Sequence, residues 1–225
     1  MWLLLSPTRL EASFLQGEPF TLFAWRGLRG EGFVYLETGL GKVNAALALA
    51  AYAARNPVEK ALLFGIAGAY PGSGLSLGKA VLVGEEVEAD LGLREGLEPL
   101  GFPALELGGR RFYHRFPLDA PLTEGLAQRL GLGVVVGLTR DLVSETPEEA
   151  QALAGRWGAA LENMEGAAFA RACLALGIPG AELRALSNVA GVRDKAAWRT
   201  REAVAALAQA VGRLLAEEKG GFRPA

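Results

Sequence analysis

The sequence predicts an α/β fold in which helices cover both faces of a mostly parallel β-sheet. Short apolar runs alternate along the chain with segments of helical periodicity. This alternation is typical of parallel sheets, because two parallel neighbours must be joined by a crossover that is usually a helix. The 225 residues, 51% of them hydrophobic, suffice for one large core. We therefore expect a single domain over residues 1–225.

Six strands are predicted from short aliphatic runs that are bounded by Gly, Pro or charged residues. The first run lies at the N-terminus, which lacks the basic start and the long apolar segment of a signal peptide. In chain order, the predicted strands are residues 2–5, 32–37, 61–64, 80–83, 134–137 and 181–186.

Four helices are predicted, and two of them have clear end signals. Thr146 is a good N-cap, Pro147 suits the first helical position, and the two acidic residues after it complement the helix dipole. Gly177 and Pro179 end the next helix. Residues 90–130, rich in Gly, Pro and Arg, have the least regular pattern and are predicted to form an insertion or lid. In chain order, the predicted helices are residues 43–55, 147–157, 165–176 and 196–217.

The composition argues against several classes of protein. No apolar run approaches the ~20 residues that span a bilayer, so no membrane segment is expected. The formal net charge of −2 argues against a nucleic-acid partner. His114 is the only histidine and Cys173 the only cysteine, so neither a His/Cys metal site nor a Ser-His-Asp triad is expected. Catalysis would then depend on carboxylates, amides, hydroxyls and the backbone, without a metal or organic cofactor.

The single cysteine also excludes an internal disulfide, which favours a cytoplasmic location. The cysteine lies in a helical apolar pattern, where a small core residue is the simpler interpretation. Abundant Ala, Leu, Gly and Arg, with scarce Asn, Gln and Met, suit a heat-adapted source.

The candidate site residues follow the predicted strands. In open α/β sheets, ligands bind beyond the carboxyl ends of the strands. Polar residues and glycine-rich turns occur at several such positions. They are Glu11, residues 38–42, residues 65–68, residues 142–145, Glu165, Ser187 and Asn188.

Two of these residues carry most of the chemistry, and each has two interpretations. Glu165 opens a helix, where an acid interacts with the helix dipole, but a carboxylate there can also hold sugar hydroxyls and stabilise positive charge. Asn188 follows a strand, where Asn is common in turns. Its amide can both donate and accept, which also suits the N7 and O6 acceptors of a 6-oxopurine.

Several further segments are also candidate parts of the site, and some of them have two interpretations. Glu11 lies either on the solvated face of an amphipathic helix or, because it follows the first strand, in the site. Residues 39–41 form a tight turn whose amides face the site, although the glycine pattern of a phosphate-binding loop is incomplete. Residues 65–68 are predicted to form a similar turn. The basic segment 110–115 is either a solvated surface or a lid that meets an anionic group.

Taken together, these motifs are similar to those of the nucleoside phosphorylase and nucleosidase superfamily, and most closely to its futalosine hydrolase branch. The Asn-Met-Glu-Gly run at 163–166 and the Ser-Asn pair at 187–188 are specific for the superfamily at this spacing. Arg193-Asp194 and Trp198 favour the futalosine branch. Further matching segments are Ser-Pro-Thr-Arg-Leu-Glu at 6–11, Thr-Gly-Leu-Gly-Lys-Val-Asn-Ala-Ala at 38–46, Phe-Gly-Ile-Ala-Gly-Ala-Tyr at 64–70 and Glu-Ala-Asp-Leu-Gly at 88–92.

The resemblance implies a three-layer αβα fold with a mixed central sheet, in a homodimer or a larger homo-oligomer. It assigns Glu165 to the ribose 2′- and 3′-hydroxyls, with Met164 packing on the sugar, and Glu11 to the activation of water. Asn188 takes the place of the aspartate of adenine-releasing nucleosidases. Arg193 is a candidate partner for the substrate carboxylate. The other substrate-binding residues that it implies are Gly68, Val143, Ser144, Asn163 and Ser187.

The implied reaction is hydrolysis of the nucleoside futalosine to hypoxanthine and dehypoxanthine futalosine, a step on a route to menaquinone. Phosphorylases of this superfamily carry an Arg and a Ser where Leu63 and Ile66 stand here, which favours water over phosphate. Arg9, Arg26 and Arg29 keep phosphorolysis open. The alternatives are a purine nucleoside phosphorylase, an adenine-releasing methylthioadenosine/adenosylhomocysteine nucleosidase and a non-catalytic nucleoside sensor.

Overall fold

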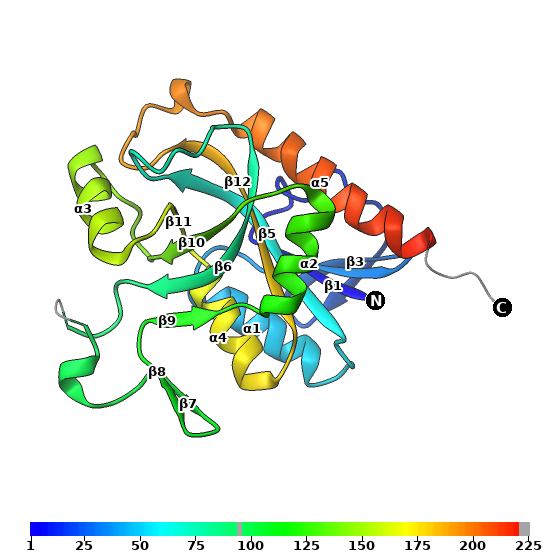
Figure 1. Ribbon diagram of the computed structural model, residues 1–225. Coiled ribbons are helices and arrows are strands. Elements are labelled where there is room, and N and C mark those ends of the chain that lie inside the picture. The colour runs from blue at the N-terminus through cyan, green and yellow to red at the C-terminus, as the bar shows by residue number, and fades with distance from the viewer. Residues whose placement is uncertain (94–95, 221–225) are drawn as a thin grey trace.

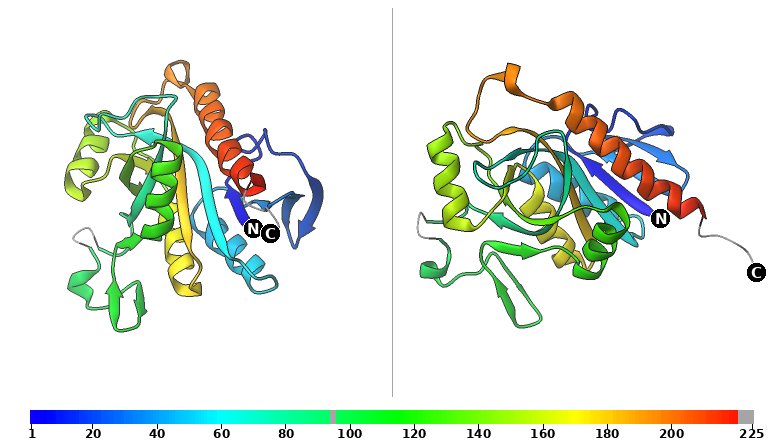
Figure 2. Two further views of the ribbon diagram at one scale, coloured as in Figure 1. Left: turned by 45° about the vertical axis from the view of Figure 1, so that its right-hand side comes forward. Right: turned by 45° about the horizontal axis from the view of Figure 1, so that its top comes forward.

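The computed structural model describes residues 1–93 and 96–220 and has three layers. A mixed sheet lies in the middle, with α1 (Lys42–Ala53) and α4 (Gly166–Leu176) on one face and α2 (Ala120–Leu130) and α5 (Thr200–Gly220) on the other (Figures 1 and 2). The three-layer α/β fold with a mixed sheet is therefore confirmed.

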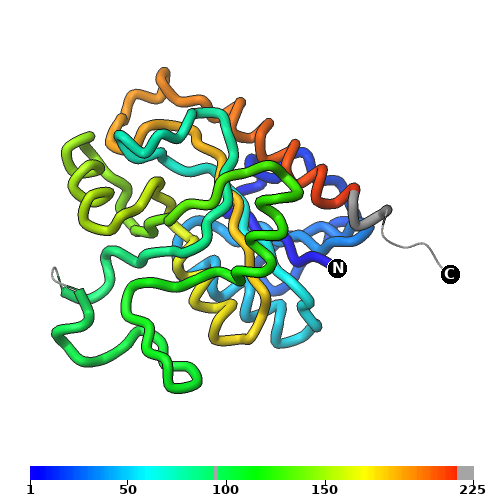
Figure 3. Tube along the Cα trace, viewed as in Figure 1, coloured from blue at the N-terminus to red at the C-terminus, as the bar shows by residue number. Residues whose placement is uncertain are grey.

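The centre of the sheet is parallel. The strand β5 (Lys60–Ala69) lies between β1 (Trp2–Ser6) and β12 (Gly180–Val189), and all three run in the same direction. Beyond β1, β4 (Phe33–Glu37) is also parallel. The hairpin of β2 (Glu18–Leu22) and β3 (Trp25–Gly30) adds an antiparallel edge, which lies near the C-terminal part of α5 (Figure 3).

On the other side, the sheet curls back on itself. The strand β6 (Ala80–Glu88) is antiparallel to β12 and parallel to β10 (Val134–Thr139), which is followed by the short β11 (Leu161–Asn163). Because β11 also pairs with the end of β5, five strands form a closed ring. The carboxyl end of β5 is thus enclosed by β12 on one side and β11 on the other.

Two large apolar clusters fix the layers. On one face, residues such as Leu49 of α1 and Phe169 of α4 are buried against the sheet. On the other face, Leu126 of α2 and Leu207 of α5 are buried. A smaller cluster includes Ala150 of α3 (Pro147–Trp157), which lies beside β10. Within the described ranges, no helix has both the length and the apolar character needed to cross a membrane.

Predicted end signals have their expected geometry. The helix α3 has the predicted bounds, and the Thr146 hydroxyl accepts a hydrogen bond from the Glu149 N–H at 3.2 Å. The helix α4 ends at Gly177, which has the left-handed backbone conformation (φ 65°) that favours glycine. All six predicted strands and four predicted helices are present, most of them with shifted ends.

Two predicted boundaries were wrong in a way that affects the site. Residues 65–68 are not a turn, because β5 continues through Ala69 with β12 and β11 as partners. Asn188 does not lie in a loop, because β12 continues through Val189 after a register shift between Leu186 and Asn188. Neighbouring strands on both sides satisfy the backbone there, which overrides the local turn preference.

The segment predicted to be an insertion or lid is only partly one. β9 (Arg115–Pro117) pairs with β6, and α2 places Leu126 and Leu130 in the core, so residues 115–130 belong to the fold. The rest includes the one-turn helix η1 (Glu98–Leu100) and a small hairpin of β7 (Leu105–Leu107) and β8 (Arg110–Phe112), which projects from the body (Figure 2). A lid role for this part remains a prediction.

Candidate active site

The candidate site is organised around Arg184, a buried cation on β12. Its Nε donates to Glu182 Oε1 at 2.7 Å, its Nη1 pairs with Glu165 Oε2 at 3.3 Å, and its Nη2 donates to Asn163 Oδ1 at 3.1 Å. Burial by itself lowers the pKa of Arg184, but the Glu182 and Glu165 carboxylates more than offset this and raise it above its ordinary value. Arg184 is therefore a fixed positive charge inside the protein.

Glu165 lies at the start of α4, yet its carboxylate does not cap the helix. The capping oxygen is Asn163 Oδ1, which accepts from the N–H groups of Glu165 (3.0 Å) and Gly166 (2.7 Å). Glu165 instead bonds Arg184 and accepts from the Gly41 N–H at 3.0 Å. The interpretation of Glu165 as a simple capping residue was therefore wrong, and the turn at 39–41 presents an amide to the site as predicted.

Glu11 is buried in a series of turns after β1, and not on the solvated face of an amphipathic helix. One carboxylate oxygen accepts from Thr8 N (3.0 Å) and Thr8 Oγ1 (2.7 Å), and the other accepts from Ile66 N at 2.9 Å. Burial raises the pKa of Glu11 above its ordinary value, although these hydrogen bonds and Arg184 partly offset the effect. A carboxylate with a raised pKa is a stronger base than an exposed one.

Gly65 lets the two sides of the site meet. A Cβ at this position would lie 2.8 Å from both Glu11 Oε1 and Arg184 Nη1. Any side chain at residue 65 would therefore push these groups apart. Because Arg184 Nη1 also contacts Glu165, three distant segments of the sequence place Glu11, Arg184 and Glu165 together in space.

Asn188 lies farther along the same strands. It is half-buried and pairs with Gly68 of β5, three residues (about 10 Å) beyond Gly65. Its Oδ1 accepts from the Ser187 hydroxyl at 2.8 Å, and its Nδ2 donates to Val189 O at 3.1 Å. Ser187, the residue at the register shift, is buried. Glu11, Glu165 and Asn188 thus share the end of β5.

The side chains of two predicted substrate-binding residues form hydrogen bonds with other protein side chains. Asn163 Nδ2 donates to Glu86 Oε1 at 2.7 Å, and its Oδ1 is used at the start of α4. The Ser144 hydroxyl donates to Glu162 Oε2 at 2.6 Å. Asn163 therefore fits a positioning role better than a direct contact with the substrate. Val143 and Met164, their neighbours in the chain, are half-buried.

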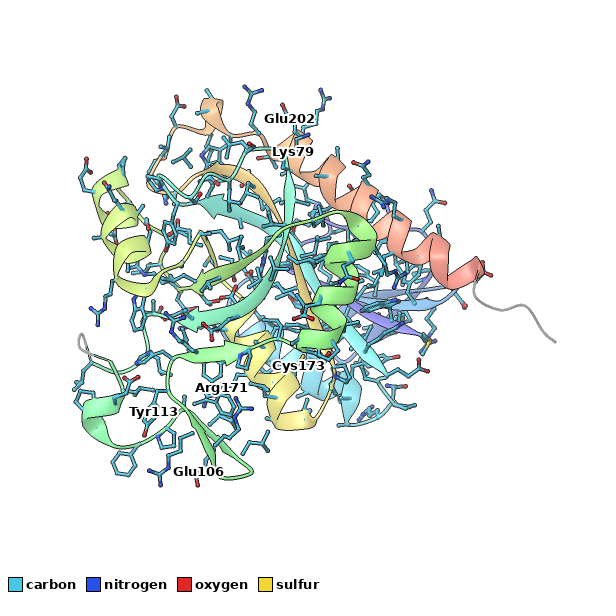
Figure 4. All side chains as sticks on the ribbon, viewed as in Figure 1. Lys79, Glu106, Tyr113, Arg171, Cys173 and Glu202 are labelled. Carbon is cyan, nitrogen blue, oxygen red and sulfur yellow. The ribbon has the colours of Figure 1, made fainter. Side chains whose placement is uncertain are left out.

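The basic segment 110–115 lies in an outlying part of the molecule. Tyr113, within this segment, and the nearby Glu106 are labelled in Figure 4. His114 is buried: its Nδ1 contacts Glu88 O at 2.8 Å and its Nε2 accepts from Leu97 N at 2.7 Å. Arg115 pairs with Glu85, and Arg111 with Glu106 at 3.3 Å. The exposed arginines fit the solvated-surface interpretation, and His114 contacts protein groups, with its Nε2 3.6 Å from Glu98 Oε2. Arg193 is also exposed, in the segment that follows β12.

The N-terminal arginines have protein partners. Arg9 donates to Ala12 O and to Leu15 O, the latter at 2.8 Å, and the Arg29 guanidinium lies 4.4 Å from the centre of the Phe20 ring. Arg9 also lines a separate cavity of about 480 Å³, with Arg26. Among the described residues, no three His, Cys, Asp or Glu side chains are arranged to hold a metal ion.

Sequence reasoning missed Arg184, Glu182, Glu86 and Glu162 as parts of the site. A signal for two of them was present. Glu182 and Arg184 are two residues apart within an otherwise apolar predicted strand, which places both on the same face. Two opposite charges on the buried face of a strand indicate a buried ion pair with a structural or functional role.

Comparison with known proteins places the chain among related sequences. Residues 16–217 match the protein family described as the Phosphorylase superfamily. The chain is 80% identical over 224 residues to the futalosine hydrolase of Thermus thermophilus, which covers 100% of this chain and 99% of that relative. It is 32% identical to the 5′-methylthioadenosine/S-adenosylhomocysteine nucleosidase of Geobacillus thermodenitrificans over 75% of this chain and 72% of that protein.

Solved structures share the fold at low sequence identity. A futalosine hydrolase mutant of Helicobacter pylori superposes with a TM-score of 0.80 at 19% identity, over 96% of this chain and 98% of that chain. The 5′-methylthioadenosine/S-adenosylhomocysteine nucleosidase of Colwellia psychrerythraea, in complex with adenine, gives a TM-score of 0.79 at 22% identity, over 96% and 94%. On the sequence match that spans most of its length, the chain belongs to the Phosphorylase superfamily.

Proposed function

We propose that this protein is a nucleosidase that hydrolyses futalosine to hypoxanthine and dehypoxanthine futalosine, on a route to menaquinone. The observation that carries the proposal is the meeting of Glu11, Arg184 and Glu165 at Gly65, with Asn188 farther along the paired strands β5 and β12. The 80% identity to a futalosine hydrolase supports this substrate. The substrate is a small-molecule nucleoside, and the chemistry needs no cofactor.

Glu165 stabilises the sugar as the glycosidic bond breaks. Bond cleavage leaves positive charge on the ribose ring and negative charge on the departing base. Each Glu165 oxygen already accepts one hydrogen bond, from Gly41 or Arg184, and retains acceptor capacity for the ribose hydroxyls. A carboxylate held in this way is preorganised for the positive charge of the transition state. Met164, the preceding residue, packs on the sugar.

Glu11 activates the attacking water. Its burial raises its pKa, which increases its affinity for the proton that the water loses. The water oxygen bonds to the anomeric carbon while the bond to the base nitrogen breaks, and the water proton passes to Glu11. Ile66 N and the two Thr8 donors hold the carboxylate in place.

Asn188 binds the departing base. One of its two Nδ2 hydrogens is used by Val189 O, so the second is available for N7 or O6 of hypoxanthine. The Ser187 hydroxyl fixes the orientation of the amide through Asn188 Oδ1. A hydrogen bond to the base stabilises the negative charge that develops on it. The backbone of three further residues contacts the purine base: Gly68, Val143 and Ser144.

Water is favoured over phosphate as the nucleophile. The arginines nearest the N-terminal turns contact backbone carbonyls or an aromatic ring, as described for Arg9 and Arg29, which leaves them poorly placed to hold a phosphate at Glu11. The purine nucleoside phosphorylase alternative therefore has weaker support. Asn188 likewise disfavours an adenine-releasing enzyme, because an aspartate would serve adenine better.

The direct experiment is incubation with futalosine, inosine and methylthioadenosine, each with and without phosphate, followed by chromatography of the released bases. The proposal requires hypoxanthine from futalosine at the same rate in both buffers. Release that depends on phosphate and yields a sugar 1-phosphate identifies a phosphorylase. Adenine release from methylthioadenosine alone identifies the other nucleosidase, and saturable binding without turnover identifies a sensor.

Replacement of Glu11 by Gln should collapse turnover while largely sparing binding. The amide keeps the size of the side chain but cannot take up the proton, and general-base catalysis contributes roughly 10²–10⁴-fold. Steady-state kinetics should show a fall in kcat of about this size with KM changed only a few-fold. Glu18→Gln, on the exposed strand β2, is the matched control. Near-normal kcat in the Glu11 variant would remove Glu11 as the base.

Replacement of Asn188 by Asp should shift the preference toward 6-aminopurines. A protonated carboxyl group can donate to adenine N7, whereas an ionised one repels the acceptors of hypoxanthine. The ratio of kcat/KM for futalosine to that for its 6-amino form should fall at least tenfold, a loss of about 1.4 kcal/mol in selectivity. If hypoxanthine release is unchanged in this variant, Asn188 does not contact the base.

The protein is further proposed to be a homodimer or larger homo-oligomer. An apolar surface next to the site supports this: Leu40 and Val43, at the start of α1, are 60% and 70% exposed, and Leu142 is 76% exposed. Lys42 ties this region together through ion pairs with Asp90 and Asp141. Apolar groups gathered in this way mark interaction surfaces.

Sedimentation should therefore report at least twice the monomer mass. Val43→Glu should shift the protein toward the monomer, because it places a charge in the apolar contact. Leu100→Glu, in η1, is the control and should leave the mass unchanged. A monomeric wild-type protein at micromolar concentration contradicts the oligomer.

A further inference from the structure

Two buried carboxyl groups lie behind the catalytic residues, and the mechanism above does not use them. Glu86 of β6 and Glu182 of β12 have no exposed surface. They converge on the first residue of α4: a Cβ on Gly166 would lie 2.5 Å from Glu86 Oε1 and 2.6 Å from Glu182 Oε1. The two acids are therefore close neighbours in the layer between the sheet and α4.

Their hydrogen bonds differ. Glu182 Oε1 accepts from Arg184 Nε at 2.7 Å, whereas Glu182 Oε2 has no hydrogen-bond partner among the described residues. Glu86 contacts Thr139 Oγ1 and Asn163 Nδ2, both at 2.7 Å. A buried carboxylate oxygen without a partner is costly. A proton held between the two acids would supply the missing partner.

The surrounding charges also require a proton here. The nearby titratable and charged groups are Arg184 on β12, Glu165 and Cys173 on α4, and Tyr70 and Glu162 around the end of β5. Cys173 is labelled on α4 in Figure 4. Arg184 is the one cation in this set. Burial and mutual repulsion raise the pKa of Glu86 well above its ordinary value, and burial raises that of Glu182.

We propose that Glu86 and Glu182 share one proton, with Glu86 neutral and Glu182 ionised, and that Glu182 holds Arg184 and balances its charge beside Glu11. This inference rests on the nucleosidase function proposed above. Both acids are positioning residues, because they act on the substrate only through Arg184 and Asn163. The N-terminal end of α4, with its positive dipole, further favours one negative charge at this place.

The contacts assign the proton to Glu86. Glu182 receives a charge-assisted bond from Arg184, which favours its ionised form. A neutral Glu86 can donate its proton to Glu182, while its own oxygens still accept from the Thr139 hydroxyl and from Asn163 Nδ2. The same hydroxyl accepts from Ala167 N at 2.8 Å.

The ion pairs of Arg184 affect the pKa of Glu11, the proposed general base. The positive charge of Arg184 lowers the pKa of Glu11, and its ion pairs with Glu182 and Glu165 limit that effect. Without the negative charge on Glu182, Arg184 would act more strongly on Glu11. Glu11 would then bind the water proton less readily.

The pH dependence of kcat/KM for futalosine tests this role. Glu182→Gln should shift the acid limb to lower pH by about one unit, because a neighbouring charge moves a pKa by about that amount. Glu86→Gln should leave the limb in place, because Gln has the charge of a neutral Glu86. Glu85→Gln, one residue away and half-exposed, is the control. Equal shifts in the Glu86 and Glu182 variants, or none in Glu182→Gln, overturn the proposal.

Thermal unfolding tests the shared proton without any assay of activity. A Glu86 pKa above its unfolded value gives stability that is present below about pH 4.5 and is lost as the pH rises through the folded pKa. Glu86→Gln removes this loss of stability. The Tm of the variant minus the Tm of the wild type should therefore increase from pH 5 to pH 8. A difference in Tm that does not change with pH contradicts the shared proton. Absence of futalosine hydrolysis would refute the proposed function but leave this test intact.

Discussion

The buried guanidinium of Arg184 is the interaction on which the site depends. It joins Glu182, Glu165 and Asn163, which come from β12, the start of α4 and β11. Removing one partner of a buried ion pair costs about 3–5 kcal/mol, because an unpaired charge remains inside the protein. The same bonds that order this part of the core also orient the Glu165 carboxylate, so under the proposed function stability and catalysis depend on the same contacts.

The fold makes this meeting of residues possible through close backbone approach. β5 and β12 run side by side to their carboxyl ends, where Gly65 lets Glu11 and Arg184 come together. Gly166 does the same for the two buried acids beneath α4. A methyl group at either glycine would displace buried side chains from the hydrogen bonds that hold them. Gly65 and Gly166 therefore allow side chains to meet around buried ionisable groups.

Much of the fold could be predicted from the sequence, because alternating apolar runs and helix caps such as Thr146 act locally. The helix α2 was missed because it lies within residues 90–130, whose Gly, Pro and Arg content indicated irregular structure. Glu11, Glu165 and Asn188 were predicted as site residues from their positions after strands and from the family resemblance. The length of β5 and the capping role of Asn163 could not be predicted, since both depend on partners that are distant in the sequence.

The turnover of Arg184→Lys with futalosine tests most directly whether the guanidinium orders the site. Lysine keeps the charge but cannot make the separate Nε, Nη1 and Nη2 contacts that Arg184 makes to three side chains. We expect a variant that still folds, as judged by circular dichroism, but whose kcat is lower by at least about 10²-fold, a typical loss for misplaced catalytic groups. A folded Lys variant with near-normal kcat would show that Glu165 and Glu11 do not depend on Arg184.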